Sequence, residues 1–218
     1  MEESMVRSSA EILEELFERR PELRACEGGV RAALREMLAC WRTGNKLMAC
    51  GNGGSAADSE HVVGELMKSF LFRRPVSAAF RERYRSVNGA SVPEWLEGAL
   101  PAVSLVSQVG LMTAFSNDES AVGVFAQQVY GYGQPGDVLL AISTSGSSPN
   151  VVAAARVARA MGVRVVSLTG ARESALSVLS DVCVRVPETE TFRVQELHLP
   201  VYHALCLAVE AEFYGGVQ

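Results

Sequence analysis

Apolar positions recur at helical spacing through the first part of the chain. In residues 5–20 the apolar side chains Ile12, Leu13, Leu16 and Phe17 alternate with glutamates and arginines, and Pro21 follows. This period predicts an amphipathic helix that the proline ends. Residues 29–43 repeat the pattern. We expect an N-terminal pair of antiparallel helices whose apolar stripes must pack on a core or on a neighbouring subunit.

The pattern changes from Lys46 onward, where short apolar runs alternate with helical segments. The five runs, expected to be strands, are 47–50, 102–106, 137–143, 163–168 and 181–186. The helical patterns between and after them are 56–70, 121–132, 150–161 and 193–213. Glycine-bounded runs separated by helices are typical of a parallel sheet covered by helices on both faces. The fold class predicted for the chain is therefore α/β.

Residues 71–98 fit neither pattern. This insert carries Arg73, Arg74, Arg81, Arg83 and Arg85, and only the segment 93–96 resembles a helix start. A connection of this length inside a compact domain is usually functional or disordered. An active-site lid, a subunit contact and a solvated surface excursion all remain open.

Composition narrows the possible class of protein. The chain is 48% hydrophobic and 21% charged, which is typical of a folded globular protein. Its net charge of −5 excludes nucleic-acid binding by bulk charge, so no nucleic-acid partner is expected. No apolar stretch is long enough to span a membrane, and the first residues lack a secretory signal, so we expect a cytoplasmic protein without a membrane partner. The five cysteines include no CxxC pair and are expected to be buried, reduced thiols.

Two loops that follow predicted strands have compositions suited to an anion. The first, Gly51-Asn52-Gly53-Gly54-Ser55, opens a predicted helix that Ser55 could cap. A plain tight turn explains it equally well, and it is not a dinucleotide fingerprint because the third glycine of GxGxxG is replaced by Ala56.

The second loop is a stronger candidate for binding phosphate. Residues 143–148 read STSGSS, and Pro149 would occupy the first turn of the next helix. Hydroxyls, a glycine and a helix start form an uncharged phosphate cradle, whereas a Ser-rich capping turn is the structural alternative. The loop lacks the lysine of a nucleotide-triphosphate loop.

The chain contains only three histidines. His61 and Glu65 lie four positions apart and would share one helix face. His198 and His203 lie near Gln195, and Pro200 between them could kink their helix. Imidazole and carboxylate groups of this kind could bind a zinc-like ion, or each could be an ordinary hydrogen-bonded side chain. Spacing alone does not show that the two helices meet.

Several segments together resemble the sugar isomerase (SIS) domain family, and within it the phosphoheptose isomerases. The resemblance extends from about residue 10 to residue 213. The segments that carry it are GNGGSAADSEH (51–61), HVVGEL (61–66), FSNDES (115–120), GDVLLAISTSGSSPNV (136–151), VVSLTG (165–170) and RVQELHLPVYHAL (193–205).

The resemblance implies a fold, an assembly and a site. The fold would be a single SIS domain over 46–218, with a five-stranded parallel sheet, the insert at 71–98 and the N-terminal helical arm at 1–45. The assembly would be a homotetramer with active sites at subunit interfaces, and each subunit would hold one zinc ion on His61, Glu65, Gln195 and His203. Glu65 and His203 would be the catalytic acid–base pair. The residues expected to bind a phosphosugar are Asn52, Gly53, Gly54, Ser55, Glu65, Asn117, Asp118, Ser143, Thr144, Ser145, Ser148 and Gln195.

The implied activity is a ketose–aldose isomerisation of sedoheptulose 7-phosphate to D-glycero-D-manno-heptose 7-phosphate by metal-assisted enediol chemistry. Two departures, the long insert and Phe192 where those enzymes tend to have aspartate, keep an isomerase for another phosphosugar open. A non-catalytic alternative is a phosphosugar-sensing or DnaA-associating regulator. That branch lacks equivalents of Glu65 and His203, so their presence here favours an enzyme.

Overall fold

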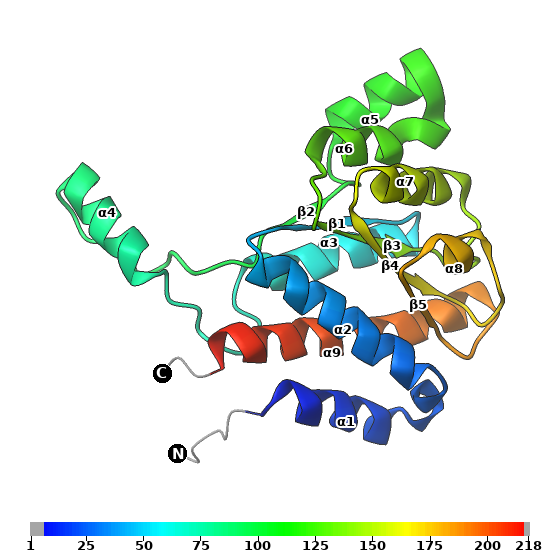
Figure 1. Cartoon of the computed structure of the whole chain (residues 1–218), viewed down its shortest axis with the longest axis horizontal. Coiled ribbons are helices and arrows are strands. Elements are labelled where there is room, and N and C mark those ends of the chain that lie inside the picture. The colour runs from blue at the N-terminus through cyan, green and yellow to red at the C-terminus, as the bar shows by residue number, and fades with distance from the viewer. Residues whose placement is uncertain (1–6, 216–218) are drawn as a thin grey trace.

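The computed structural model describes residues 7–215, and five strands in this part of the chain form one parallel sheet (Figure 1). Their order is β2-β1-β3-β4-β5, and every neighbouring pair is parallel. The strands are β1 (Leu47–Cys50), β2 (Ala102–Ser104), β3 (Val138–Ile142), β4 (Arg164–Thr169) and β5 (Val182–Arg185). The α/β prediction with a five-stranded parallel sheet is confirmed.

The helices follow the strands in the expected alternation. Those anticipated from the sequence are α1 (Ser9–Arg19), α2 (Glu27–Arg42), α3 (Gly54–Met67), α6 (Val124–Tyr132), α7 (Pro149–Ala160) and α9 (Thr191–Tyr214). The additional ones are α4 (Ala78–Asn88), α5 (Val109–Phe115) and α8 (Ala175–Leu179), with the short segments η1 (Pro21–Cys26), η2 (Ser116–Ser120) and η3 (Ala121–Gly123). Positions 5 and 6 of the first predicted helix lie outside the described residues. The α9 helix continues through Pro200.

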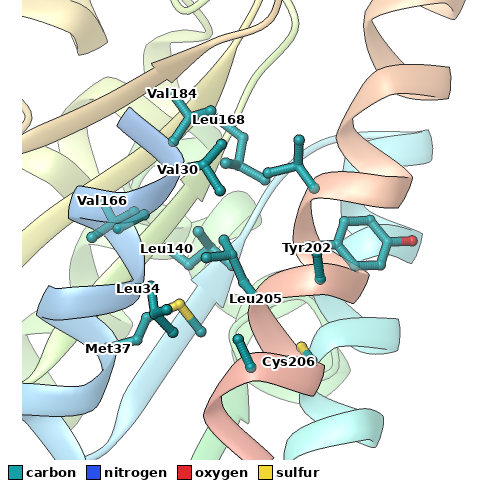
Figure 2. Packing of buried hydrophobic residues seen from close by; sticks show 14 of the residues in the cluster. Val30, Leu34, Met37, Leu140, Val166, Leu168, Val184, Tyr202, Leu205 and Cys206 are labelled. Carbon is teal, nitrogen blue, oxygen red and sulfur yellow. The ribbon is translucent and has the colours of Figure 1, made fainter. Parts of the chain in front are cut away.

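Side chains of the central strand alternate between two cores. In β3, Val138, Leu140 and Ile142 pack with residues of α1, α2, α3 and α9, whereas Leu139 and Ala141 pack with α6 and α7. Figure 2 shows Leu140 among residues of α2 and α9 in the first core. Because both faces of the strand are buried, its sequence is a continuous apolar run.

The N-terminal helices belong to the first core. Ile12, Leu13, Leu16 and Phe17 of α1 are buried in the same cluster as Val201 and Leu205 of α9. The start of α1 is fixed by a capping box, in which Ser8 and Glu11 each accept a backbone hydrogen bond from the other. A further contact of residues 1–45 with neighbouring subunits stays a prediction.

The 71–98 insert contains a helix that sequence reasoning missed. Helix α4 stands away from the other elements in Figure 1, and none of its residues is buried. Ser77 caps its start, and Gly89 ends it in the left-handed conformation. The helix start predicted at 93–96 is wrong, because this segment forms only a turn in which Leu96 N donates to Pro93 O.

The contrast between core and insert predicts that two apolar truncations differ strongly in their effect on the free energy of unfolding. Leu140 is 1% exposed, so Leu140→Ala should lower the free energy of unfolding by about 2–5 kcal/mol. Val87 of α4 is 73% exposed, so Val87→Ala should change it by less than about 0.5 kcal/mol. Urea unfolding of both variants checks this. A large loss for Val87→Ala would show that α4 is buried against something in solution.

Candidate active site

The order of the strands places two loops side by side. In the order β2-β1-β3-β4-β5, the chain reverses direction of winding between β1 and β3, which are neighbours. Ligands of open parallel sheets bind at the carboxyl ends of the strands next to such a switch point. The glycine loop follows β1 and the serine loop follows β3, so both candidate loops lie there. Asn52 and Asn150 connect them through two reciprocal amide hydrogen bonds of 2.9 Å.

The glycine loop presents an uncapped helix start. Helix α3 has Gly53 as its N-cap with φ of 56°, and no side chain caps it. This conformation favours glycine, and the free backbone N–H groups beyond it can bind an anion. The prediction that Ser55 caps the helix is wrong, because Ser55 already lies in the first turn and is buried.

The serine loop is held in place by its neighbours. Ser143 N donates to Leu168 O of β4, and the Ser143 and Ser148 hydroxyls lie 3.0 Å apart. Gly146 has φ of 64°, and a Cβ atom there would collide with the Ser174 hydroxyl. Pro149 is at the start of α7, as predicted, and no side chain caps that helix. A second uncapped helix start thus faces the same edge of the sheet, with exposed Ser145 beside it.

Helices α3 and α9 meet, which the sequence could not show. His61 Nε2 lies 3.2 Å from Glu65 Oε1 on the same helix and 3.4 Å from His203 Nε2 on α9. The Glu65 side chain is 12% exposed and His61 42% exposed, so the cluster lies at an accessible edge. The ring of Phe70 packs beside His203, with centroids 5.7 Å apart. The structure therefore brings together Glu65 and His203, the predicted acid–base pair, and His61, so that three of the four predicted metal ligands lie in one cluster.

A hydrogen-bond chain orients the His61 ring. The Tyr202 hydroxyl donates to Asp58 Oδ1 at 3.1 Å and lies 3.1 Å from His61 Nδ1. Since the hydroxyl has a single proton, it accepts from Nδ1–H of His61 while it donates to Asp58. His61 Nε2 is then left with a free lone pair that faces Glu65 and His203. In Figure 2 the Tyr202 ring projects from α9 away from the other labelled side chains. The residue is nevertheless buried, because its hydroxyl faces Asp58 of α3.

Burial shifts the pKa values of His203 and Asp58 toward their neutral forms. Burial lowers the pKa of His203, and the neighbouring His61 lowers it further. Burial also raises the pKa of Asp58, partly offset by the hydrogen bond from Tyr202. A neutral His203 can accept a proton, donate its other N–H or bind a metal.

The donor set consists of residue types that zinc prefers. Among residues 7–215, no group of three or more His, Cys, Asp or Glu side chains is placed so that it could hold a metal ion. However, two imidazole nitrogens and a carboxylate oxygen face one another at 3.2 and 3.4 Å, and tetrahedral zinc with bonds of about 2.0–2.1 Å separates its ligand atoms by about 3.4 Å. The remaining predicted ligand, Gln195, packs its amide against Gly54, where a Cβ would collide with it.

Asn117 and Asp118, which are predicted to bind substrate, do not belong to the cluster of His61, Glu65 and His203 within a single chain. Asn117 and Asp118 lie exposed in η2, where the Asn117 amide donates to the Asp118 carboxylate at 2.8 Å. A cavity of about 450 Å³ next to His203 is lined by residues of α1 and α9 and by Phe70 and Leu71, not by the glycine or serine loops. The serine loop lies outside this cavity, and its Ser145 and Ser147 are exposed in the single chain.

Sequence reasoning missed two supporting residues. Asp58 precedes His61 by three positions on one helix, so the same spacing rule that paired His61 with Glu65 could have found it. Tyr202 adjoins His203 in sequence, but only the packing of α9 on α3 shows its contact with Asp58.

His198 lies outside this cluster. Its ring is completely buried, and neither nitrogen has a hydrogen-bond partner among the described residues. Burial lowers its pKa to about 4, an effect that the nearby backbone of Thr169 partly opposes. Of the three histidines, only His61 and His203 are placed to act on a ligand.

An open parallel sheet with glycine and serine loops at its switch point and an imidazole–carboxylate cluster beside them defines an α/β protein with a candidate site for an anionic ligand. The SIS domain family model matches residues 7–98 and 82–170 of the chain. The chain therefore belongs to the SIS domain family, and within it to the phosphoheptose isomerases.

Relatives and solved structures agree on this placement. The chain is 37% identical to a phosphoheptose isomerase of Akkermansia muciniphila over 194 residues, covering 89% of this chain and 90% of the relative. It is 38% identical to that of Rhodospirillum rubrum over 185 residues, covering 85% and 86%. The structure of phosphoheptose isomerase GmhA from Neisseria gonorrhoeae superimposes with a TM-score of 0.69 at 32% identity, covering 88% of this chain and 92% of that one. A phosphoheptose isomerase from Francisella tularensis gives 0.70 at 28% identity, covering 90% and 93%.

The buried His198 predicts a pH dependence of stability. Its pKa of about 4 in the folded chain lies below the ordinary value of 6.5, so the unfolded chain binds more protons between these pH values. Stability should fall as pH falls from 6.5 to 4, by up to about 3 kcal/mol from this group. Urea unfolding across this range should show a shallower pH slope for His198→Leu than for the natural chain. Equal slopes would contradict the assignment.

Proposed function

We propose that the chain interconverts sedoheptulose 7-phosphate and D-glycero-D-manno-heptose 7-phosphate. It is an aldose–ketose isomerase of the phosphoheptose isomerase kind. The observation that carries the proposal is the contact of Glu65 and His203 with the same imidazole, on helices that meet beside the switch-point loops. An acid–base pair and a phosphate cradle are the two parts that this reaction needs.

The reaction moves a proton between C1 and C2 of the sugar through an enediol. The Glu65 carboxylate takes the carbon-bound proton, and His203 moves protons at the sugar oxygens. The lowered pKa of His203 keeps the ring neutral near pH 7, so it can accept a proton from a hydroxyl. Half-buried Phe70 limits the access of water on one side of the His203 ring.

Phosphate binding is assigned to the serine loop, and binding of the sugar is assigned to the glycine loop and to Gln195. The hydroxyls of Ser143, Thr144, Ser145 and Ser148 and the amides at the start of α7 hold the phosphate. Asn52, Gly53, Gly54, Ser55 and Gln195 contact the sugar from the start of α3 and from α9. The reciprocal amide pair of Asn52 and Asn150 supports this, because it keeps the two loops at one spacing.

Each subunit would hold one zinc ion on His61, Glu65, Gln195 and His203. The approach of the Glu65 carboxylate and the His203 imidazole to His61 Nε2 supports this, because all three side chains can be ligands of zinc. When bound, the ion would polarise the sugar carbonyl and stabilise negative charge on its oxygen. A carboxylate bound to zinc is a weaker base, so Glu65 would act as the base only while it is not bound to the ion.

The assembly would be a homotetramer with active sites at subunit interfaces. The exposed position of Asn117 and Asp118 supports this, because a neighbouring subunit could bring these residues to the serine loop. The cytoplasm is the proposed location, supported by five free cysteines. None of the helices in residues 7–215 is long and apolar enough to cross a membrane.

Replacing the base tests the proposed activity directly. Glu65→Gln keeps the size of the side chain but removes the carboxylate, so turnover should fall about 100- to 10,000-fold while phosphosugar binding persists. Glu60→Gln, an exposed position on the same helix, is the control and should turn over normally. A panel of five- to seven-carbon ketose phosphates identifies the sugar. Normal turnover by Glu65→Gln would restrict Glu65 to a structural role, and no turnover of any sugar by the natural chain would refute the activity.

Metal content is tested independently of activity. The protein prepared with excess zinc and then dialysed should retain one ion per subunit by elemental analysis. His61→Asn should weaken zinc binding about tenfold or more, since even outer-shell losses have this effect. Glu60→Gln should retain the metal. Absence of a stoichiometric divalent ion from the natural chain would contradict the site.

A further inference from the structure

The insert begins at a completely buried ion pair. Arg74 and Glu210 of α9 are both 0% exposed, and Arg74 Nε donates to Glu210 Oε1 at 2.8 Å. The same carboxylate accepts from the backbone N–H groups of Phe70 at 2.7 Å and Leu71 at 2.8 Å. Glu210 thus fixes both the arginine and the chain that leads into the insert.

The other side of the guanidinium holds the end of α3. Arg74 Nη2 donates to the Glu65 carbonyl at 2.9 Å, and Nη1 donates to the Leu66 carbonyl at 2.5 Å. These carbonyls belong to the last turn of α3, where backbone acceptors lack partners within the helix. Arg74 therefore caps the helix at the residue that carries the proposed base. The ring of Tyr214 lies 5.2 Å from the guanidinium carbon and covers it.

The ion pair of Arg74 and Glu210 also connects the last turn of α3 to the helix that carries His203. Glu210 follows His203 by seven positions on α9, so the two side chains project from nearly the same side of the helix. One guanidinium thereby joins the backbone of Glu65 to the helix that carries His203. Lysine could not replace it, because a single ammonium lacks the planar fork that reaches one carboxylate and two carbonyls together.

Stability alone does not account for such a pair. Replacing a buried ion pair with apolar side chains of similar volume is often neutral or stabilising, whereas breaking it by removing one member is strongly destabilising. We propose that Arg74 and Glu210 form a positioning pair that sets the distance and orientation between Glu65 and His203. This inference rests on the isomerase function proposed above, and neither residue touches the substrate.

The test separates positioning from stability through a double replacement. Arg74→Met leaves the Glu210 charge buried without its partner and should lower the melting temperature. Arg74→Met combined with Glu210→Gln removes both charges and keeps a side-chain acceptor for the backbone N–H groups at the start of the insert, so it should recover most of the lost melting temperature. If the pair positions the base, kcat of the double variant should stay about 10- to 100-fold below that of the natural chain, with KM changed less than about threefold. Recovery of kcat together with the melting temperature would overturn the proposal.

Arg74→Lys provides a milder variant in case the methionine variants fold poorly. It keeps a positive charge beside Glu210 but loses the forked contact with α3, so the same loss of kcat is expected with a nearly natural melting temperature. Lys46→Met is the matched control: Lys46 pairs with buried Asp137 at 2.6 Å at the amino end of the sheet. This control should lose stability without loss of kcat. Natural kcat in Arg74→Lys would count against the proposal.

A structural readout keeps the proposal distinct from the proposed activity. Amide hydrogen exchange in a peptide covering residues 60–70 should be about tenfold faster in Arg74→Lys and in the double variant, and unchanged in Lys46→Met. If the natural chain isomerises no phosphosugar, the activity fails, and this exchange still decides whether Arg74 fixes the end of α3. Exchange at the natural rate in both variants would show that it does not.

Discussion

Burial of the neighbouring strands β1 and β3 on both faces of the sheet is the constraint on which the rest of the structure depends. Every residue of β1 and β3 is buried, so helices must cover both sides of the sheet. Connections between parallel strands then place their loops at the carboxyl edge. The change of winding between β1 and β3 separates the neighbouring connections and leaves room for a ligand. The proposed phosphate cradle is a consequence of this topology, and the glycines of its loops permit the close approach of backbone to a ligand.

The proposed catalytic cluster brings together polar side chains that would not otherwise associate. Its polar atoms face one another across two helices, where unshared lone pairs repel unless a proton or a cation lies between them. The surrounding structure fixes them there: Tyr202 and Asp58 orient the His61 ring, and Arg74 with Glu210 holds the last turn of α3. Helix α3 is therefore fixed at both ends, by the glycine loop at its start and by a guanidinium at its end.

The root of the 71–98 insert and its outer helix α4 differ in how far their side chains are buried. At the root the Arg74 side chain is fully enclosed, and Gly98 N donates to the Arg74 carbonyl. Its outer helix α4 buries no side chain. The root can therefore influence the geometry of the site while the outer helix varies in sequence without cost to the core.

The sequence by itself determined the strands, the main helices and the two anion loops, because apolar periodicity and glycine or serine clusters are local signals. It also paired His61 with Glu65, since four-residue spacing fixes a common helix face. Sequence reasoning missed α4, although Phe80, Tyr84 and Val87 recur there at helical spacing, and it assigned the cap of α3 to Ser55 instead of Gly53. The apolar positions of α4 are few and none is buried, so they lack the longer pattern of a helix that packs on a core. Only the tertiary structure decided that α9 brings His203 to His61 and that Arg74 reaches Glu210 and α3. The contacts of His203 with His61 and of Arg74 with Glu210 join residues more than a hundred positions apart, and no spacing rule along the chain encodes the packing of one helix on another.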